Sequence, residues 1–119
     1  MIKVNIIVND IKFRTTLEEN STVDAFIKLL PLRLEMNKYK EKEVYYYLKK
    51  VLPTNTISRS TLDNGTLYLS KDNCLTLVYE TYSTKEEYTP IGKIDDPTDL
   101  KSAFSNNERE VIIELIKKI

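Results

Sequence analysis

The sequence predicts a mainly β protein, a closed barrel of about eight strands with two short helices at its ends. Apolar and polar residues alternate along several short segments, as they do in strands that bury one face. Only two segments carry the start signals of a helix, and no repeat or linker divides the chain. We therefore expect a single domain over residues 1–119, whose closed sheet would leave no exposed strand edge.

Four segments in the first half of the chain alternate in this way and are predicted to be strands. They are residues 2–8, 11–17, 32–36 and 44–48. Asn9 and Asp10 suit a two-residue turn, so the first pair should form a hairpin. The charged segment 37–42 is expected to connect the second pair.

The second half is predicted to hold four further strands beside two polar loops. The strands are residues 65–69, 74–79, 91–94 and 111–116, and the loops are residues 51–64 and 80–89. The loop before Gly65 is the longest irregular stretch, and loops of such length are often functional or mobile. A helix is the alternative for the last segment, because Glu110, Glu114, Lys117 and Lys118 would suit one.

Two short helices are expected, each with recognisable end signals. Ser21 or Thr22 can cap the first helix, and Pro31 should end it. Its apolar stripe consists of Val23, Phe26, Ile27 and Leu30, and we expect Phe26 to be fully buried. Asp96 followed by Pro97 predicts the start of the second helix, whose inner face would be Leu100, Ala103 and Phe104.

The composition excludes several kinds of chemistry. The chain has no histidine and one cysteine, so it lacks the usual general base and cannot build an ordinary zinc site. Its two glycines form no phosphate-binding loop, and no cofactor is expected. A net charge of zero argues against nucleic-acid and membrane partners. With no signal peptide pattern and no possible internal disulfide, the cytoplasm is the expected location.

A set of residues spread over nearly the whole chain resembles the small bacterial cyclophilin-like domain family. The resembling segments are Leu30-Pro31-Leu32-x-Leu34-x-Met36, Tyr46-Tyr47-Leu48, Gly65-x-Leu67-Tyr68, Asn73-x-Leu75-x-Leu77, Tyr88-Thr89-x-Ile91-Gly92-x-Ile94 and the continuation to Pro97. The resemblance implies an eight-stranded barrel with a helix at each end, in agreement with the alternating pattern. It implies little about function, because most members of that family have no established activity.

Cyclophilins themselves are peptidyl-prolyl isomerases, and the resemblance raises that activity as an alternative. Their catalysis relies on an arginine near a Phe-His-Arg motif, with glutamine, histidine and aromatic residues around a proline pocket. This chain contains no histidine, tryptophan or glutamine. Arg33 lies on the strand after the first helix, as the catalytic arginine does in cyclophilins, but its neighbours differ. No catalytic residue is carried over, since a shared barrel does not transmit an activity.

Two groups of residues are candidates for a ligand site. Tyr82, Ser83, Tyr88 and Thr89 gather tyrosine rings and hydroxyl groups around the second polar loop, and such a cluster can bind a peptide or small molecule. Arg33 beside Tyr46 or Tyr68 could anchor a carboxylate or phosphate. The plainer interpretations are that the tyrosines cover the barrel end and that Arg33 pairs with Glu35 or an acid on a neighbouring strand. Cys74 is expected to be a small buried apolar residue.

The leading hypothesis is a non-catalytic binding module for a small molecule or an extended peptide. It depends on the tyrosine-rich loop and on the lack of a catalytic constellation. A weak prolyl isomerase that uses Arg33 is the alternative from another class. A structural domain that acts by oligomerising is the third hypothesis, and the sequence does not indicate an oligomeric state.

Overall fold

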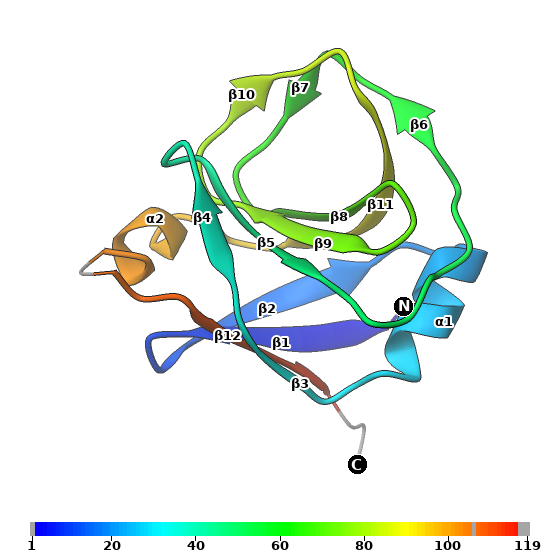
Figure 1. The fold of residues 1–119 in the computed structure, drawn as a ribbon. Coiled ribbons are helices and arrows are strands. Elements are labelled where there is room, and N and C mark those ends of the chain that lie inside the picture. Colours follow the sequence, from blue (N-terminus) through cyan, green and yellow to red (C-terminus); the bar gives the residue numbers. More distant parts are fainter. Residues whose placement is uncertain (1, 106, 117–119) are drawn as a thin grey trace.

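The structure, a computed structural model, describes residues 2–105 and 107–116. Two helices, α1 (Ser21–Ile27) and α2 (Leu100–Ala103), lie on opposite sides of a strongly curved sheet (Figure 1). The strands are β1 (Lys3–Val8), β2 (Ile11–Leu17), β3 (Leu32–Glu35), β4 (Asn37–Tyr39), β5 (Glu43–Tyr47), β6 (Ile57–Ser58), β7 (Thr61–Leu62), β8 (Thr66–Ser70), β9 (Cys74–Val78), β10 (Tyr82–Ser83), β11 (Glu87–Ile94) and β12 (Glu110–Leu115).

The main sheet closes into a barrel through one bent segment of chain. Its strand order is β3-β12-β1-β2-β11-β8-β9-β5-β4, and all neighbours are antiparallel. The two outermost strands, β3 and β4, are separated only by Met36, so they are halves of a single strand. The first half pairs with β12 and the second with β5, which joins the two ends of the sheet. Counted this way, the nine strands of the order form the predicted eight-stranded barrel with two short helices.

The predicted hairpin at the start of the chain is confirmed. Asn9 and Asp10 have φ angles of 51° and 63°, the left-handed values that a type I′ turn requires at both central positions. Val8 pairs with Ile11 across the turn, and the register continues to Lys3 and Thr16. The same alternation that predicted the hairpin puts one side chain of every two inside the barrel.

The barrel interior is filled by these inward-facing residues and by α1. Phe26 is 0% exposed and belongs to the main core, as its place in the apolar stripe predicted. The helix cap differs from the prediction, because Asn20 caps α1 through its Oδ1, which accepts a 2.8 Å hydrogen bond from the Val23 amide. Thr22 is instead used to tie α1 to the next loop, and its hydroxyl donates to the carbonyl of Pro53.

Three other boundaries differ from the sequence prediction, and the first is the end of α1, which lies at Ile27 and not beside Pro31. The expected connection 37–42 contains β4, which pairs with β5 and completes the barrel. The second helix begins at Leu100, because Asp96 caps a separate turn by accepting a 3.2 Å hydrogen bond from the Thr98 amide. The last segment is the predicted strand, β12, so the alternative of a terminal helix is wrong for residues 110–115. Lys117 and Lys118, which suggested that helix, lie outside the described residues.

A small outer layer covers part of the barrel wall, and the sequence did not predict it. The two long loops each contain short strands, with β7 pairing with β10 and β6 pairing with the start of β11. In Figure 1 these strands form the arch above β8, β9 and β11. A second apolar core lies beneath the arch, composed of Leu62, Tyr68, Val78 and Tyr88, with Ile57 and Tyr82 packed against it. Two polar loops therefore become a second layer with its own core.

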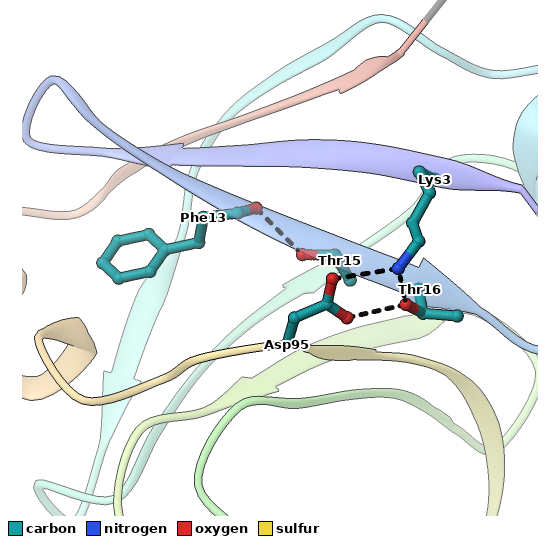
Figure 2. Close-up of polar contacts among 5 residues, drawn as sticks. All are labelled: Lys3, Phe13, Thr15, Thr16 and Asp95. Carbon is teal, nitrogen blue, oxygen red and sulfur yellow. Dashed lines mark hydrogen bonds and ion pairs between the residues drawn. The ribbon is translucent and has the colours of Figure 1, made fainter.

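A polar network on the other side of the barrel joins β1, β2 and the end of β11 (Figure 2). Lys3 donates to Thr16 and to Asp95, at 2.9 Å for Asp95 Oδ2, and the Thr16 hydroxyl donates to Asp95 Oδ1 at 2.6 Å. The hydrogen bonds from Thr16 and then Lys3 lower the pKa of Asp95 below its ordinary value. The network thus fixes a charged group at a three-strand junction.

None of the helices in the described residues has the length and apolar character needed to cross a membrane.

Candidate functional site

Tyrosine side chains collect on the outer face of β5, β9 and β8. Tyr45 on β5 is paired with Thr76 on β9, which is paired in turn with Tyr68 on β8. Two residues further along β5, Tyr47 is paired with Cys74 on β9, which is paired in turn with Ser70 on β8. The intervening leucines of β8 and β9 point into the main core. Because side chains alternate along a strand, these six residues share one face.

Glu43 is the only carboxylate buried in this face among the described residues. It is 8% exposed and lies opposite Tyr39 on β4 and Val78 on β9. The hydroxyl of Tyr82 donates to Glu43 Oε1 at 2.5 Å, and the hydroxyl of Tyr68 lies 3.2 Å from the same oxygen and 3.4 Å from Oε2. The two hydroxyl oxygens are 3.3 Å apart. The carboxylate therefore links the barrel wall to β10 of the outer layer.

Burial keeps both phenols protonated, so they act as hydrogen-bond donors. Burial raises the pKa of Tyr68 from 10.0 to about 12, and the charge of Glu43 adds to the effect while the hydrogen bond with Tyr82 opposes it. Burial also raises the pKa of Tyr82, and its hydrogen bond to Glu43 raises it further. An ionised carboxylate only accepts hydrogen bonds, and a protonated phenol can donate one to it.

Two adjoining cavities open over these residues, and we call them together the tyrosine groove. The larger has a volume of about 430 Å³ and lies between the barrel and the outer layer, and the smaller, of about 220 Å³, lies over β5, β8 and β9. Tyr39, Glu43, Tyr68 and Ser70 line both. The larger cavity is also lined by Lys40, Lys42, Leu62, Tyr82, Ser83, Thr84, Glu86, Glu87 and Tyr88, and the smaller by Tyr45, Tyr47, Cys74 and Thr76.

Aromatic and charged contacts shape the walls of the tyrosine groove. The rings of Tyr39 and Tyr45 are 6.5 Å apart with an interplanar angle of 77°, and those of Tyr45 and Tyr47 are 5.7 Å apart at 76°. The ammonium of Lys42 lies 5.0 Å from the centre of the Tyr82 ring, and that of Lys40 lies 5.2 Å from the centre of the Tyr39 ring. These are edge-to-face and cation–π geometries, which fix ring orientations at a surface.

Four of the seven residues proposed from the sequence line the tyrosine groove. They are Tyr68, Tyr82, Ser83 and Tyr88. Thr89 is next to them but fully buried, where its hydroxyl accepts a 3.0 Å hydrogen bond from the Asn55 amide and holds the first long loop. Tyr46 packs against the main core, on the opposite side of β5 from Tyr45.

Arg33 does not join the tyrosines. Its side chain is 70% exposed, and its Nη1 lies 3.4 Å from Glu110 Oε2 on the neighbouring strand β12. This is the plainer of the two interpretations of Arg33, an ion pair with an acid on an adjacent strand. The combination of Arg33 with Tyr46 or Tyr68 is wrong, because the barrel places the three residues on different walls or faces.

Glu43, Tyr39, Tyr45 and Tyr47 are groove residues that the sequence analysis did not select. The signal of Glu43, Tyr45 and Tyr47 is present in the alternation of residues 43–47, where the odd positions face away from buried Val44. What makes Glu43 informative is its burial beneath Tyr82, and that contact spans 39 residues of sequence. The pattern of residues along a single strand does not reveal this long-range contact.

Nothing in the described residues points to metal or thiol chemistry in this groove. Across residues 2–105 and 107–116, no cluster of three or more Asp, Glu, Cys or His side chains has metal-binding geometry. Cys74 is buried, as expected, and burial raises the pKa of its thiol. A raised pKa disfavours the reactive thiolate. The groove offers hydrogen bonds, aromatic surface and one buried carboxylate.

Comparison with known proteins identifies the family. No curated protein matches the chain. The family model described as the cyclophilin-like family matches residues 6–115, which include every strand of the barrel except the first three residues of β1. The barrel closed by β3 and β4, with its two short helices, agrees with that match. The chain belongs to the cyclophilin-like family.

Proposed function

We propose that this member of the cyclophilin-like family is a non-catalytic binding module, and that its ligand occupies the tyrosine groove. The ligand is a small molecule or a short extended peptide. One observation carries the proposal: a buried carboxylate, held by two tyrosine hydroxyls, lies in the wall of a cavity that four tyrosine rings also line. Binding sites typically combine such aromatic surface with a few fixed polar groups.

The exposure of these tyrosines supports a binding role over simple packing. Tyr47 is 59% exposed and Tyr39 is 48% exposed, yet neighbouring rings hold both in edge-to-face contacts. Large rings with few rotatable bonds lose little entropy when they contact a ligand. Rings that only closed the barrel end would be buried, as Tyr79 is at 3%.

The isomerase alternative draws no support from the tyrosine groove. Cyclophilin-type catalysis would need a guanidinium at the ligand, and no arginine is among the described residues that line either cavity. Arg33 is engaged with Glu110 on a different wall of the barrel. Isomerase activity and a purely oligomeric role therefore stay as alternatives that experiments separate from ligand binding.

For location we propose a reducing compartment such as the cytoplasm, in keeping with a single free cysteine.

A thermal-shift screen against small molecules and short peptides tests the proposal. A ligand that binds the native state and not the unfolded chain raises the melting temperature, and the rise grows with the logarithm of the ligand concentration above Kd. We expect the rise to be lost when Tyr45 and Tyr47 are both changed to Ala, because these rings line the cavity without belonging to the main core. Arg33→Ala is the matched control, an exposed residue outside the groove, and should keep the full rise. Ligands that stabilise all three proteins equally would refute binding in the tyrosine groove.

A further inference from the structure

The smaller cavity of the tyrosine groove has an unusual balance of charge. Among the residues that the structure describes, four tyrosines line it, and Glu43 is the one charged side chain in its lining. The lysines of the groove, Lys40 and Lys42, line only the larger cavity. The smaller cavity thus has a single negative charge surrounded by aromatic rings.

Glu43 has acceptor capacity to spare. Its Oε1 receives both tyrosine hydroxyls, whereas Oε2 has only the 3.4 Å contact with Tyr68. Each carboxylate oxygen can accept two hydrogen bonds. No ion pair within residues 2–105 and 107–116 includes Glu43, although the residue is 8% exposed. Burying a carboxylate without a counter-charge is costly, so a cation arriving from outside would be bound favourably.

The tyrosine rings add attraction for the same charge. A cation within about 6 Å of an aromatic ring centre is attracted by the ring's negative face. The protein already shows this, since the ammonium groups of Lys40 and Lys42 lie over Tyr39 and Tyr82. No lysine or arginine of the described residues lies over the ring of Tyr45, Tyr47 or Tyr68. These three rings line the smaller cavity beside Glu43.

The size of the cavity limits the cationic group. A volume of about 220 Å³ is below the range of roughly 300–1,000 Å³ that is common for whole drug-sized ligands. It suits a head group, and the remainder of the ligand would extend into the larger cavity through the shared residues Tyr39, Tyr68 and Ser70.

We infer that the smaller cavity recognises an organic ammonium group, which pairs with Glu43 and lies against Tyr45, Tyr47 and Tyr68. The inference rests on the proposed function and specifies its ligand class. The ammonium belongs to a small molecule or to a lysine side chain of an extended peptide, and the same chemistry recognises both. A neutral group of the same shape gains neither the ion pair nor the cation–π contacts.

The test compares a cation with its neutral isostere. Choline and 3,3-dimethylbutan-1-ol have the same shape and differ in charge, and each is titrated into labelled protein while amide chemical shifts are recorded. We expect choline to shift the amides of Ser70, Cys74 and Thr76 and to bind at least about tenfold more tightly than the alcohol. Butylamine and an acetylated, amidated tripeptide with a central lysine form two further arms, which distinguish a small-molecule amine from a peptide side chain.

Variants separate the charge of Glu43 from its shape. Glu43→Gln keeps an acceptor for the tyrosine hydroxyls but removes the charge. It should weaken choline binding at least about tenfold and leave the binding of the alcohol unchanged. Glu19→Gln is the matched control, because Glu19 is exposed and lines neither cavity of the groove, and choline binding should persist. Should Glu43→Gln fail to fold, the comparison of choline with the alcohol on the unaltered protein remains the test, and equal binding of the two would overturn the inference.

The outcomes distinguish this inference from the proposed function beneath it. Equal binding of choline and the alcohol, or unchanged choline binding in Glu43→Gln, would overturn the ammonium inference. If uncharged ligands from the screen bind the tyrosine groove and no ammonium compound does, the inference fails while the binding module stands. If neither kind of ligand binds the groove, both fail.

Discussion

The carboxylate of Glu43 and the hydroxyl of Tyr82 are joined by a 2.5 Å hydrogen bond that spans 39 residues. Glu43 begins β5 of the barrel, and Tyr82 begins β10 of the outer layer. Around this contact lie the second apolar core and the larger cavity of the tyrosine groove. The bond therefore fixes the outer layer to the barrel at the place where we propose that the ligand binds.

Removing the Tyr82 hydroxyl should destabilise the protein by loosening this contact. Tyr82→Phe leaves the buried carboxylate with Tyr68 as its remaining recorded donor, and losing a hydrogen bond to a charged group costs about 1.5–3 kcal/mol. Urea denaturation measures the free energy of unfolding. In a Glu43→Gln background the same change should cost less, because the acceptor is no longer charged. Equal costs in the two backgrounds would show that the charge of Glu43 is not what Tyr82 stabilises.

The stability of the protein should fall in alkali as Tyr68 begins to ionise. Its pKa is raised from 10.0 to about 12 in the folded state, chiefly by burial. Between these values the unfolded chain releases the proton and the folded chain keeps it, so the free energy of unfolding declines as the pH rises from about 10 to 12. Tyr68→Phe should show a shallower decline, which denaturation at several pH values measures. A wild-type protein whose stability stays constant over this window would contradict the raised pKa.

Gly92 is required where β11 passes close to β2. A Cβ atom at this position would lie 2.7 Å from the carbonyl oxygen of Thr16 and 2.9 Å from Leu17 Cδ2. The register of β11 against β8 also shifts between Pro90 and Gly92, as in a bulge. We expect Gly92→Val to lower the free energy of unfolding by about 1–3 kcal/mol through the clash with backbone, not through a special φ angle.

Lys93→Val is the control for Gly92→Val, because it introduces the same side chain at the next position, where the side chain is 54% exposed. Its effect should stay within about 0.5 kcal/mol, as is usual at the surface. A Gly92→Val protein with the stability of the control would remove the close-approach explanation.

We expect no acceleration of prolyl isomerisation. The barrier to rotation of an X-Pro bond is about 20 kcal/mol, and positioned charges must lower it. Arg33 is exposed and paired with Glu110, and it is not among the groove residues. An X-Pro test peptide should therefore isomerise at its uncatalysed rate at high protein concentration. If the rate rises, the same assay is repeated with Arg33→Ala. Loss of the acceleration in that variant would establish the isomerase alternative.

The barrel could be predicted from the sequence because its signals are local. Each strand alternates within itself, and Asn9-Asp10 marks the turn of the first hairpin at its own position. The outer layer could not be predicted from the sequence, because β7 and β10 have only two residues each. Both are stabilised by a core whose residues come from distant strands. Asn20 was missed as a cap because three adjacent residues, Asn20, Ser21 and Thr22, are all good capping residues.

The candidate site was predicted only where it follows from composition. Tyrosines and hydroxyl residues around the second loop are visible in the sequence, and three of the four selected there line the tyrosine groove. Glu43 was missed because its importance depends on burial and on partners from β8 and β10. Arg33 was overvalued because position on a strand does not reveal which wall of a barrel that strand forms.

Mapping a bound ligand onto the barrel by amide chemical shifts tests the central claim most directly. Any compound that raises the melting temperature in the screen is titrated into labelled protein, and the shifted amides are placed on the fold. We expect them to cluster on β4, β5, β8, β9 and β10, around Tyr45, Glu43 and Tyr82. A cluster on β3 and β12 around Arg33, with the groove amides unmoved, would contradict it.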